Sequence, residues 1–272
     1  MTAINTNVGA LLSRMNAKSA DGRMQTHMRR LSSGLRVNSA SDDAAGLAVA
    51  NKLKSQLTGI NMGIRNSSDA IGVLQTADAG YATAMNITLR MKELAIQMSN
   101  SIYTTADRTN AAVEFAQLGA QVEAISDNTL FNGEVLLSGA YGSTTNLMSM
   151  RIGDATAEVL SLDLDDADIY STTHLISSTT QASDTATALA AAINTLSNAQ
   201  ADVGAYINRL QFNIDNLSAA ATVTEAAVGR VMDADYARET GELAKQQILN
   251  QAATSMLAQA NQSKQSILAL LQ

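Results

Sequence analysis

The fold is decided by residues 189–231, LAAAINTLSNAQADVGAYINRLQFNIDNLSAAATVTEAAVGRV. Apolar side chains recur in this stretch with alternating spacings of four and three over six heptads, a pattern typical of a coiled-coil seam. The seam positions are Leu189, Ile193, Leu196, Gln200, Val203, Ile207, Leu210, Ile214, Leu217, Ala221, Thr224, Val228 and Val231. A continuous helix over this span would be about 60 Å long at 1.5 Å per residue. Such a helix needs a partner that covers its seam.

A partner of similar length is predicted in the N-terminal third of the chain. The same spacing recurs at Leu53, Leu57, Ile60, Ile64, Ser67, Ile71 and Leu74, and resumes at Ile87, Met91, Leu94 and Met98. Ser41, Asp42 and Asp43 can cap its start. A shorter third helix is indicated by Phe115, Leu118, Val122 and Ile125, after the capping candidates Thr104 and Thr105. Three helices of this kind can bury one another's seams.

The two ends of the chain repeat the helical pattern more weakly. Near the start, one stripe holds Ile4, Val8, Leu11 and Met15, and a second, after a phase slip, holds Met24, Met28, Leu31 and Leu35. Near the end, the spacing recurs at Leu249, Ala253, Met256, Ala260, Ser263, Ile267 and Leu270. Small seam residues bury little apolar area. We therefore expect the termini to form a thin helical layer that depends on association with neighbouring chains.

The middle of the chain has strand-like patterns instead. Asn132-Gly133 is a turn signal, and apolar residues alternate with polar ones at residues 148–152 and 160–164. These features predict a small β-meander with one solvent-facing side. Residues 171–187 are rich in Ser and Thr without clear helical periodicity, which favours a surface loop.

Composition excludes several classes of protein. The chain of 272 residues has no Pro, no Cys and no Trp, and its net charge is −7. Without clustered Lys and Arg, nucleic acid is not an expected partner. Since no run of about 18 apolar residues occurs, membrane insertion is not expected. The opening residues also lack the pattern of a secretory signal peptide, and disulfides are impossible.

Residues that could carry chemistry are scattered. His27 and His174 have no second histidine at a metal-ligand spacing, and we interpret both as solvent-exposed bystanders. The run Asp163, Asp165, Asp166 and Asp168 lacks the glycine and the final glutamate of a calcium loop. Glycines are not grouped as in nucleotide-binding loops. The sequence predicts no enzyme, no metal site and no cofactor.

Several long motifs resemble one family. SSGLRVNSASDDAAGLAVANKL at residues 32–53 and INTN at residues 4–7 are similar to the N-terminal signature of bacterial flagellins. DADYARETGELAKQQILNQAATSMLAQANQ at residues 233–262 and the ending SILALLQ resemble their C-terminal signature. LRMKELAIQMSN at residues 89–100 and LFNG at residues 130–133 are also similar. The resemblance covers nearly the whole chain.

The resemblance implies the following fold and function. The fold would be mainly α, with residues 1–43 and 231–272 forming a terminal coiled-coil core domain. Residues 44–230 would form an outer helical domain with a β-hairpin region at about 130–165. This is a short form, in which the large outer domains of other members are absent. The chain would leave the cell through the flagellar type III apparatus and self-polymerise into the extracellular filament that drives swimming.

The resemblance also implies partners and site residues. Partners would be further copies of the chain, an export chaperone, the filament cap, hook-junction proteins, sister flagellins and the animal Toll-like receptor for flagellin. The expected polymerisation core, in which the C-terminal stripe packs against the N-terminal one, comprises Ile4, Val8, Leu11, Met15, Leu35, Leu249, Met256, Ile267 and Leu270. Gly34 would allow a bend between the domains. The candidates for receptor recognition are Arg90, Lys92, Glu93, Leu94 and Glu114.

Other possibilities stay open at this point. O-linked sugars, where present, are expected on Ser143, Thr144, Thr145, Ser177, Ser178, Thr179 and Thr180. A hook–filament junction protein shares the terminal signatures, and a surface-displayed flagellin-like adhesin is a second alternative. For the charged face at Arg90, Lys92 and Glu93, simple solvation competes with a role in recognition.

Overall fold

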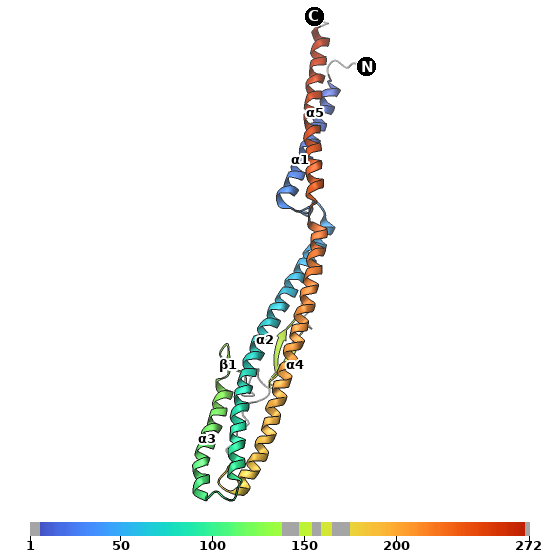
Figure 1. Cartoon of the computed structure of the whole chain (residues 1–272). Helices are drawn as coiled ribbons and strands as arrows, with labels where there is room; N and C mark the ends of the chain where they lie inside the picture. The colour runs from blue at the N-terminus through green and yellow to red at the C-terminus, as the bar shows by residue number, and fades with distance from the viewer. Residues whose placement is uncertain (1–5, 138–146, 154–158, 165–174, 270–272) are drawn as a thin grey trace. The chain divides into compact units, whose positions relative to one another are not determined.

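Long helices dominate the computed structural model, which describes residues 6–137, 147–153, 159–164 and 175–269 (Figure 1). Within these ranges there are five helices: α1 (Val8–Ser33), α2 (Ala44–Met98), α3 (Thr105–Asn128), α4 (Thr179–Met232) and α5 (Tyr236–Ala269). The predicted mainly α fold is confirmed. Residue contacts divide the chain into a terminal unit, Met1–Ser55 with Val223–Gln272, and an outer unit, Gln56–Thr222.

The outer unit is built around the seam between α2 and α4, which run side by side with α3 (Figure 1). On α4 the buried side chains recur every seven residues, at Leu189, Leu196, Val203, Leu210 and Leu217. On α2 they do the same at Ile60, Ser67, Leu74, Tyr81, Thr88 and Ala95. The polar seam residue Gln200 donates to Asp78 of α2 at 3.4 Å. The predicted pairing of the two long helices is confirmed, and α2 is continuous where the apolar pattern was interrupted.

The starts of α2 and α3 use the capping residues that the sequence indicates. Asp43 precedes α2 and accepts a hydrogen bond from the backbone N–H of Gly46 at 2.8 Å. Thr104 and Asp107 form a reciprocal capping box at the start of α3. Both arrangements satisfy backbone donors that have no partner within the first helical turn.

The strands form two separate hairpins. β1 (Leu130–Phe131) pairs with β2 (Glu134–Val135) through a turn in which Asn132 and Gly133 both have positive φ, as a tight hairpin turn requires. β3 (Leu147–Arg151) pairs antiparallel with β4 (Val159–Asp163), with Met148 opposite Leu162 and Met150 opposite Leu160. The expected small β region is confirmed, and its described strands make two separate two-stranded sheets.

The end of β3 is held against α2 and α4 by polar contacts. The side-chain amide of Asn213 donates to the carbonyl oxygen of Ile152 at 2.9 Å, and that of Asn66 donates to the carbonyl of Arg151 at 2.8 Å. Gly63 permits this approach, since a Cβ there would lie only 3.0 Å from the Ile152 oxygen. The hairpin thus closes one side of the helical seam.

Helix α4 overlaps the loop predicted at residues 171–187. The expectation is wrong from Thr179 onward, because α4 begins there. Ala182, Thr185 and Leu189 are buried at helical spacing, and the hydroxyl of Thr185 donates to the carbonyl of Leu175 at 2.8 Å. Because Ala and Thr are weak signals in a hydrophobic pattern, the sequence does not reveal this first part of the helix.

Candidate polymerisation surface of the terminal helices

In the terminal unit, α1 and α5 lie side by side along a seam of small and polar residues (Figure 1). The most deeply buried side chains are seven residues apart, Ser13 and Ala20 on α1, and Glu239, Gln246 and Ala253 on α5. Near the start of α1, Asn7 caps the helix and donates to the carbonyl of Ala260 at 3.1 Å. Small side chains allow the helices to approach closely, but they bury little apolar area.

Larger apolar side chains in the first half of α1 face away from this seam. Val8, Leu11 and Met15 are 63%, 55% and 63% exposed. Leu11 precedes buried Ala20 by nine residues, which at about 100° per residue places the two on opposite sides of the helix. The expectation that these residues pack against the C-terminal stripe of the same chain is therefore wrong. They form an outward apolar stripe, called here the α1 stripe.

The remaining residues of the expected core are distributed differently. Leu249 and Met256 of α5 are 46% and 61% exposed. Leu35 is half-buried and forms an isolated bridge with Asp233. Ile267 lies within α5, while Ile4 and Leu270 lie outside the described residues. Leu12 and Ile248, which the heptad pattern does not identify, are also exposed, and their only signal in the sequence is that they are apolar residues off the heptad positions.

A groove of about 520 Å³ runs along one side of the pair. Ser13 and Ala20 contribute to it from α1 and Ala253 from α5, together with the exposed apolar side chains of Leu12, Leu249 and Met256. The terminal unit therefore exposes apolar surface both on the α1 stripe and along this groove. Apolar side chains that gather on an exposed face mark a candidate interaction site.

The phase slip near the start of the sequence has a structural explanation. In the second apolar stripe, Met24 and Leu31 are half-buried and continue the inward seam of Ser13 and Ala20, whereas Met28 is 56% exposed. The first stripe, by contrast, faces outward. The helix is continuous from Val8 to Ser33, and only the direction of its apolar residues changes.

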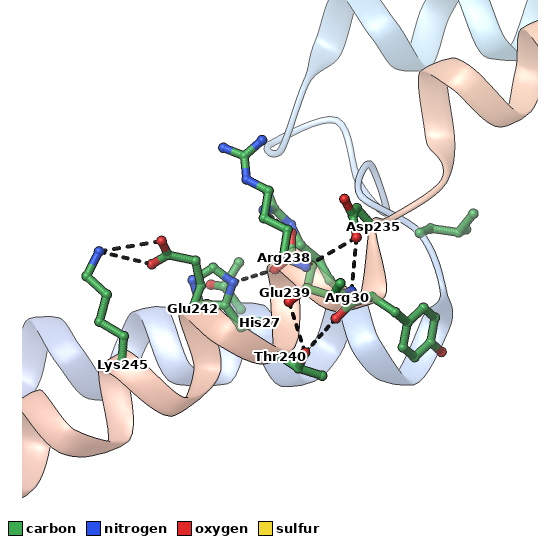
Figure 2. A network of polar contacts seen from close by, with 12 residues as sticks. His27, Arg30, Asp235, Arg238, Glu239, Thr240, Glu242 and Lys245 are labelled. Atoms are coloured by element: carbon green, nitrogen blue, oxygen red, sulfur yellow. Dashed lines mark hydrogen bonds and ion pairs between the residues drawn. The ribbon is translucent and has the colours of Figure 1, made fainter.

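A buried polar cluster joins α1 to the start of α5 (Figure 2). The carboxylate of Glu239 is hydrogen-bonded to Nδ1 of His27 and accepts a hydrogen bond from Arg30 at 3.2 Å. Burial by itself would raise the pKa of Glu239, but the hydrogen bond from His27 and the positive charge of Arg30 outweigh it, so the net pKa is lowered. His27 is only 15% exposed, so the interpretation of this residue as a solvent-exposed bystander is wrong.

Paired backbone segments lie where α1 ends and where α5 begins. Gly34 ends α1 in the left-handed conformation, with φ 73°, and its N–H donates to the carbonyl of Arg30 at 2.9 Å. The N–H of Ala234 donates to the carbonyl of Gly34 at 2.9 Å. The hydroxyl of Tyr236 donates to the carbonyl of Leu31 at 2.6 Å. These contacts fix how the ends of α1 and α4 meet the start of α5.

The candidate recognition residues lie on α2 and α3 in the outer unit. Arg90 is half-exposed and forms ion pairs with Glu93 at 3.2 Å and with Glu114 at 3.1 Å. The hydrogen bonds to Glu93 and Glu114 raise the pKa of Arg90. Lys92 is half-buried, and Leu94 is only 4% exposed within the core. Leu94 therefore supports the helix from inside and is not placed to contact a partner.

The candidate glycosylation residues fall partly within α4. Ser177, Ser178 and Thr180 are exposed and Thr179 is half-buried. Ser178 also caps α4, because its hydroxyl accepts from the N–H of Gln181 at 3.2 Å. Ser143, Thr144 and Thr145 lie outside the described residues.

No described helix is long and apolar enough to span a membrane. In the same part of the chain, no three metal-binding side chains of His, Cys, Asp or Glu are grouped. His174 and most of the acidic run lie outside the described residues.

Long paired helices with exposed apolar faces define a class of proteins that associate through helical packing, and comparison with known proteins identifies the family within this class. The bacterial flagellin N-terminal helical region matches residues 4–142, and the C-terminal helical region matches residues 186–271. The flagellar filament 33 kDa core protein of Treponema phagedenis is 36% identical, covering 98% of this chain and 99% of the relative. Flagellin of Halalkalibacterium halodurans is 37% identical, with the same coverage. The chain belongs to the bacterial flagellin family.

Solved structures agree with this assignment. The crystal structure of Bacillus cereus flagellin is similar with a TM-score of 0.51 and 29% identity, over 60% of this chain and 94% of that one. A flagellar hook-associated protein of Vibrio parahaemolyticus has a TM-score of 0.61, over 71% of this chain and 100% of that one. Since its identity is only 13%, this second likeness shows the fold alone. Flagellins are structural filament proteins, and this chain is accordingly not an enzyme.

Proposed function

We propose that the chain polymerises with copies of itself through the exposed apolar surfaces of its terminal helix pair. As a flagellin, it is a structural subunit of the extracellular bacterial flagellar filament that serves swimming motility. The observation that carries the proposed surface is that α1 turns Val8, Leu11 and Met15 outward while small residues fill its own seam with α5. Association with further copies would remove these side chains from water.

The two exposed apolar surfaces suit a contact between different patches of identical subunits. The α1 stripe and the groove beside Leu249 and Met256 are different surfaces of the same helix pair. When two different patches of identical subunits meet, the contact is heterologous, and it generates rings or helical filaments. We assign the inner layer of the filament to residues 1–43 and 231–272, and the outer layer to residues 44–230.

Family membership supports the finer roles proposed here. The chain would be exported by the flagellar type III apparatus with a chaperone and added beneath the filament cap, next to hook-junction proteins and sister flagellins. Gly34, with its left-handed backbone at the end of α1, would permit a bend between the layers. O-linked sugars, where present, would be carried by the Ser/Thr stretch that includes Ser177 and Thr180, and measurement of the intact mass would detect them.

Seeded assembly tests the proposed surface. Purified chain is mixed with short filament seeds and a precipitating salt, and the product is examined by sedimentation and negative-stain electron microscopy. Long uniform tubes are expected from the wild type, and soluble subunits from Leu11→Asp, because the charge falls in the α1 stripe. Gln25→Asp is the matched control, because it introduces the same negative charge at an exposed polar position of the same helix. Normal tubes from Leu11→Asp would contradict the proposed surface, and persistent wild-type subunits would favour a junction-type protein.

We also propose that the ion-paired surface of α2 and α3 contacts the animal Toll-like receptor for flagellin. The supporting observation is that Arg90, Glu93 and Glu114, from two helices, form one exposed charged group. Arg90→Asp reverses the central charge and should lower the receptor's reporter response at least tenfold. Arg65→Asp, a change of the same kind at another exposed arginine of α2, is the control. An unchanged response from a folded Arg90→Asp protein would refute this contact.

A further inference from the structure

Phe212 is an exposed aromatic side chain in the middle of α4. It is 75% exposed, although large aromatic side chains favour burial and dominate the energetics of interfaces. It follows buried Val203 by nine residues, which at about 100° per residue turns it to the far side of α4, away from the seam with α2. Phe115, by comparison, is only 2% exposed in the core of the same unit.

Charged residues of opposite sign flank Phe212. Arg209 lies three residues before it and Asp215 three residues after it, and both are exposed. Residues three apart on a helix are neighbours on its surface. This part of α4 therefore presents one aromatic side chain with a positive group on one side and a negative group on the other.

A pocket of about 280 Å³ lies elsewhere in the outer unit, between α2 and the two hairpins. Its apolar lining includes Val73, Phe131 and Met150, and its charged lining residues are Asp69 and Arg151. Pockets for drug-sized molecules range from about 300 to 1,000 Å³. A cavity just below that range suits a single large side chain.

We infer that Phe212 of one subunit inserts into this pocket of a second subunit, with Arg209 facing Asp69. This inference rests on the proposed self-polymerisation and adds a contact between outer units to it. Phe212 with its flanking residues is called here the knob. Its charges complement those of the pocket, since the knob carries Arg209 and Asp215 while the pocket is lined by Asp69 and Arg151. Complementary charges fix the register of an interface and speed its formation.

The contact is heterologous and has a defined consequence for assembly. The knob lies on α4 and the pocket on α2 with β1 and β3, so each subunit carries one of each. In a pair bound in this way, one subunit still presents a free pocket and the other a free Phe212, so addition can continue. The outer unit would thereby contribute to subunit order independently of the terminal helices.

Single substitutions test the knob. Phe212→Ser should raise the critical concentration for seeded assembly about tenfold or more, because a largely buried aromatic contact is lost. Ile102→Ser is the matched control, since Ile102 is 81% exposed at the connection between α2 and α3, away from the pocket. Thermal unfolding of both variants should match the wild type. Equal critical concentrations for the wild type and a folded Phe212→Ser protein would overturn the inference.

A charge swap tests the partner assignment. Arg209→Asp and Asp69→Arg should each weaken assembly, because each brings like charges together across the contact. The double variant should recover at least part of the lost affinity, since it restores an opposite pair. Additive losses in the double variant would show that these residues do not face each other.

The two proposals fail in different ways. If wild-type subunits form no polymer under any seeded condition, the proposed self-polymerisation fails and the inference fails with it. If wild-type tubes form and all Phe212, Arg209 and Asp69 variants assemble equally well, only the inference fails. Loss of assembly in Phe212→Ser with rescue in the charge-swapped pair supports both.

Discussion

Replacing Glu239 by glutamine should loosen the pairing of α1 and α5 without affecting the outer unit. The side chain of Glu239 is only 9% exposed and interacts with His27 and Arg30 (Figure 2). Because these partners lower its pKa below the ordinary value of 4.5, ionisation of Glu239 stabilises the folded terminal unit. That stabilisation is fully present above pH 4.5 and is lost as the pH falls through the lowered pKa.

The size of the effect follows from the two hydrogen bonds. Hydrogen bonds to charged groups contribute roughly 1.5–3 kcal/mol, and neutral ones roughly 1 kcal/mol. Glutamine keeps the shape of the side chain but loses the charge, so each of the two hydrogen bonds is weakened by about 1 kcal/mol. The free energy of opening the helix pair should therefore fall by about 2 kcal/mol. This corresponds to about a thirtyfold increase in local opening.

Hydrogen exchange followed by mass spectrometry measures local opening directly. At neutral pH, amides of α1 and α5 should exchange about thirtyfold faster in Glu239→Gln than in the wild type, while those of α3 should not change. The difference should shrink in acid, where the wild type also loses the carboxylate. Glu242→Gln is the control, because its exposed pair with Lys245 at 3.4 Å contributes little. Equal effects from the two substitutions would refute the reasoning.

Three further substitutions probe the outer unit. Leu74→Ala removes a fully buried seam residue and should cost about 2–5 kcal/mol, seen as a melting temperature lowered by about 5 °C or more. Gly63→Val should displace the β3–β4 hairpin, because even a Cβ would lie 3.0 Å from the oxygen of Ile152, and faster exchange of the hairpin amides should report it. Thr104→Ala breaks the capping box with Asp107 and should cost about 1 kcal/mol in denaturant unfolding, whereas an unchanged midpoint would show that the cap contributes nothing.

The helices of the outer unit were predictable because their signal is dense. The seam residues of α4 are mostly branched apolar side chains at unbroken spacings of four and three, and burial of Leu189, Leu196 and Leu210 follows from that pattern alone. The start of α3 was predictable for a local reason, since Thr104 caps through atoms three residues away. The first turns of α4 were missed because Ala182 and Thr185 give little hydrophobic contrast.

The candidate surface was only partly predictable. The sequence identified Val8, Leu11 and Met15 as one apolar stripe, but periodicity states which residues share a face and does not state what that face meets. The partner seam on α1 is made of Ser13 and Ala20, whose small side chains give a weak signal in a hydrophobic pattern. The same limitation concealed the polar contact between His27 and Glu239, which are 212 residues apart.

The sequence by itself determined the long helices, their heptad seams, their caps and the family to which the chain belongs. These are properties of local spacing and of long motifs, which can be recognised along the chain. Only the tertiary structure decided that α1 turns Val8, Leu11 and Met15 outward, and that Phe212 is exposed while a pocket forms beside Phe131. These outcomes depend on how closely segments that are distant in the sequence approach each other. Small residues at the contacts set that distance, and they contribute little to a hydrophobic pattern.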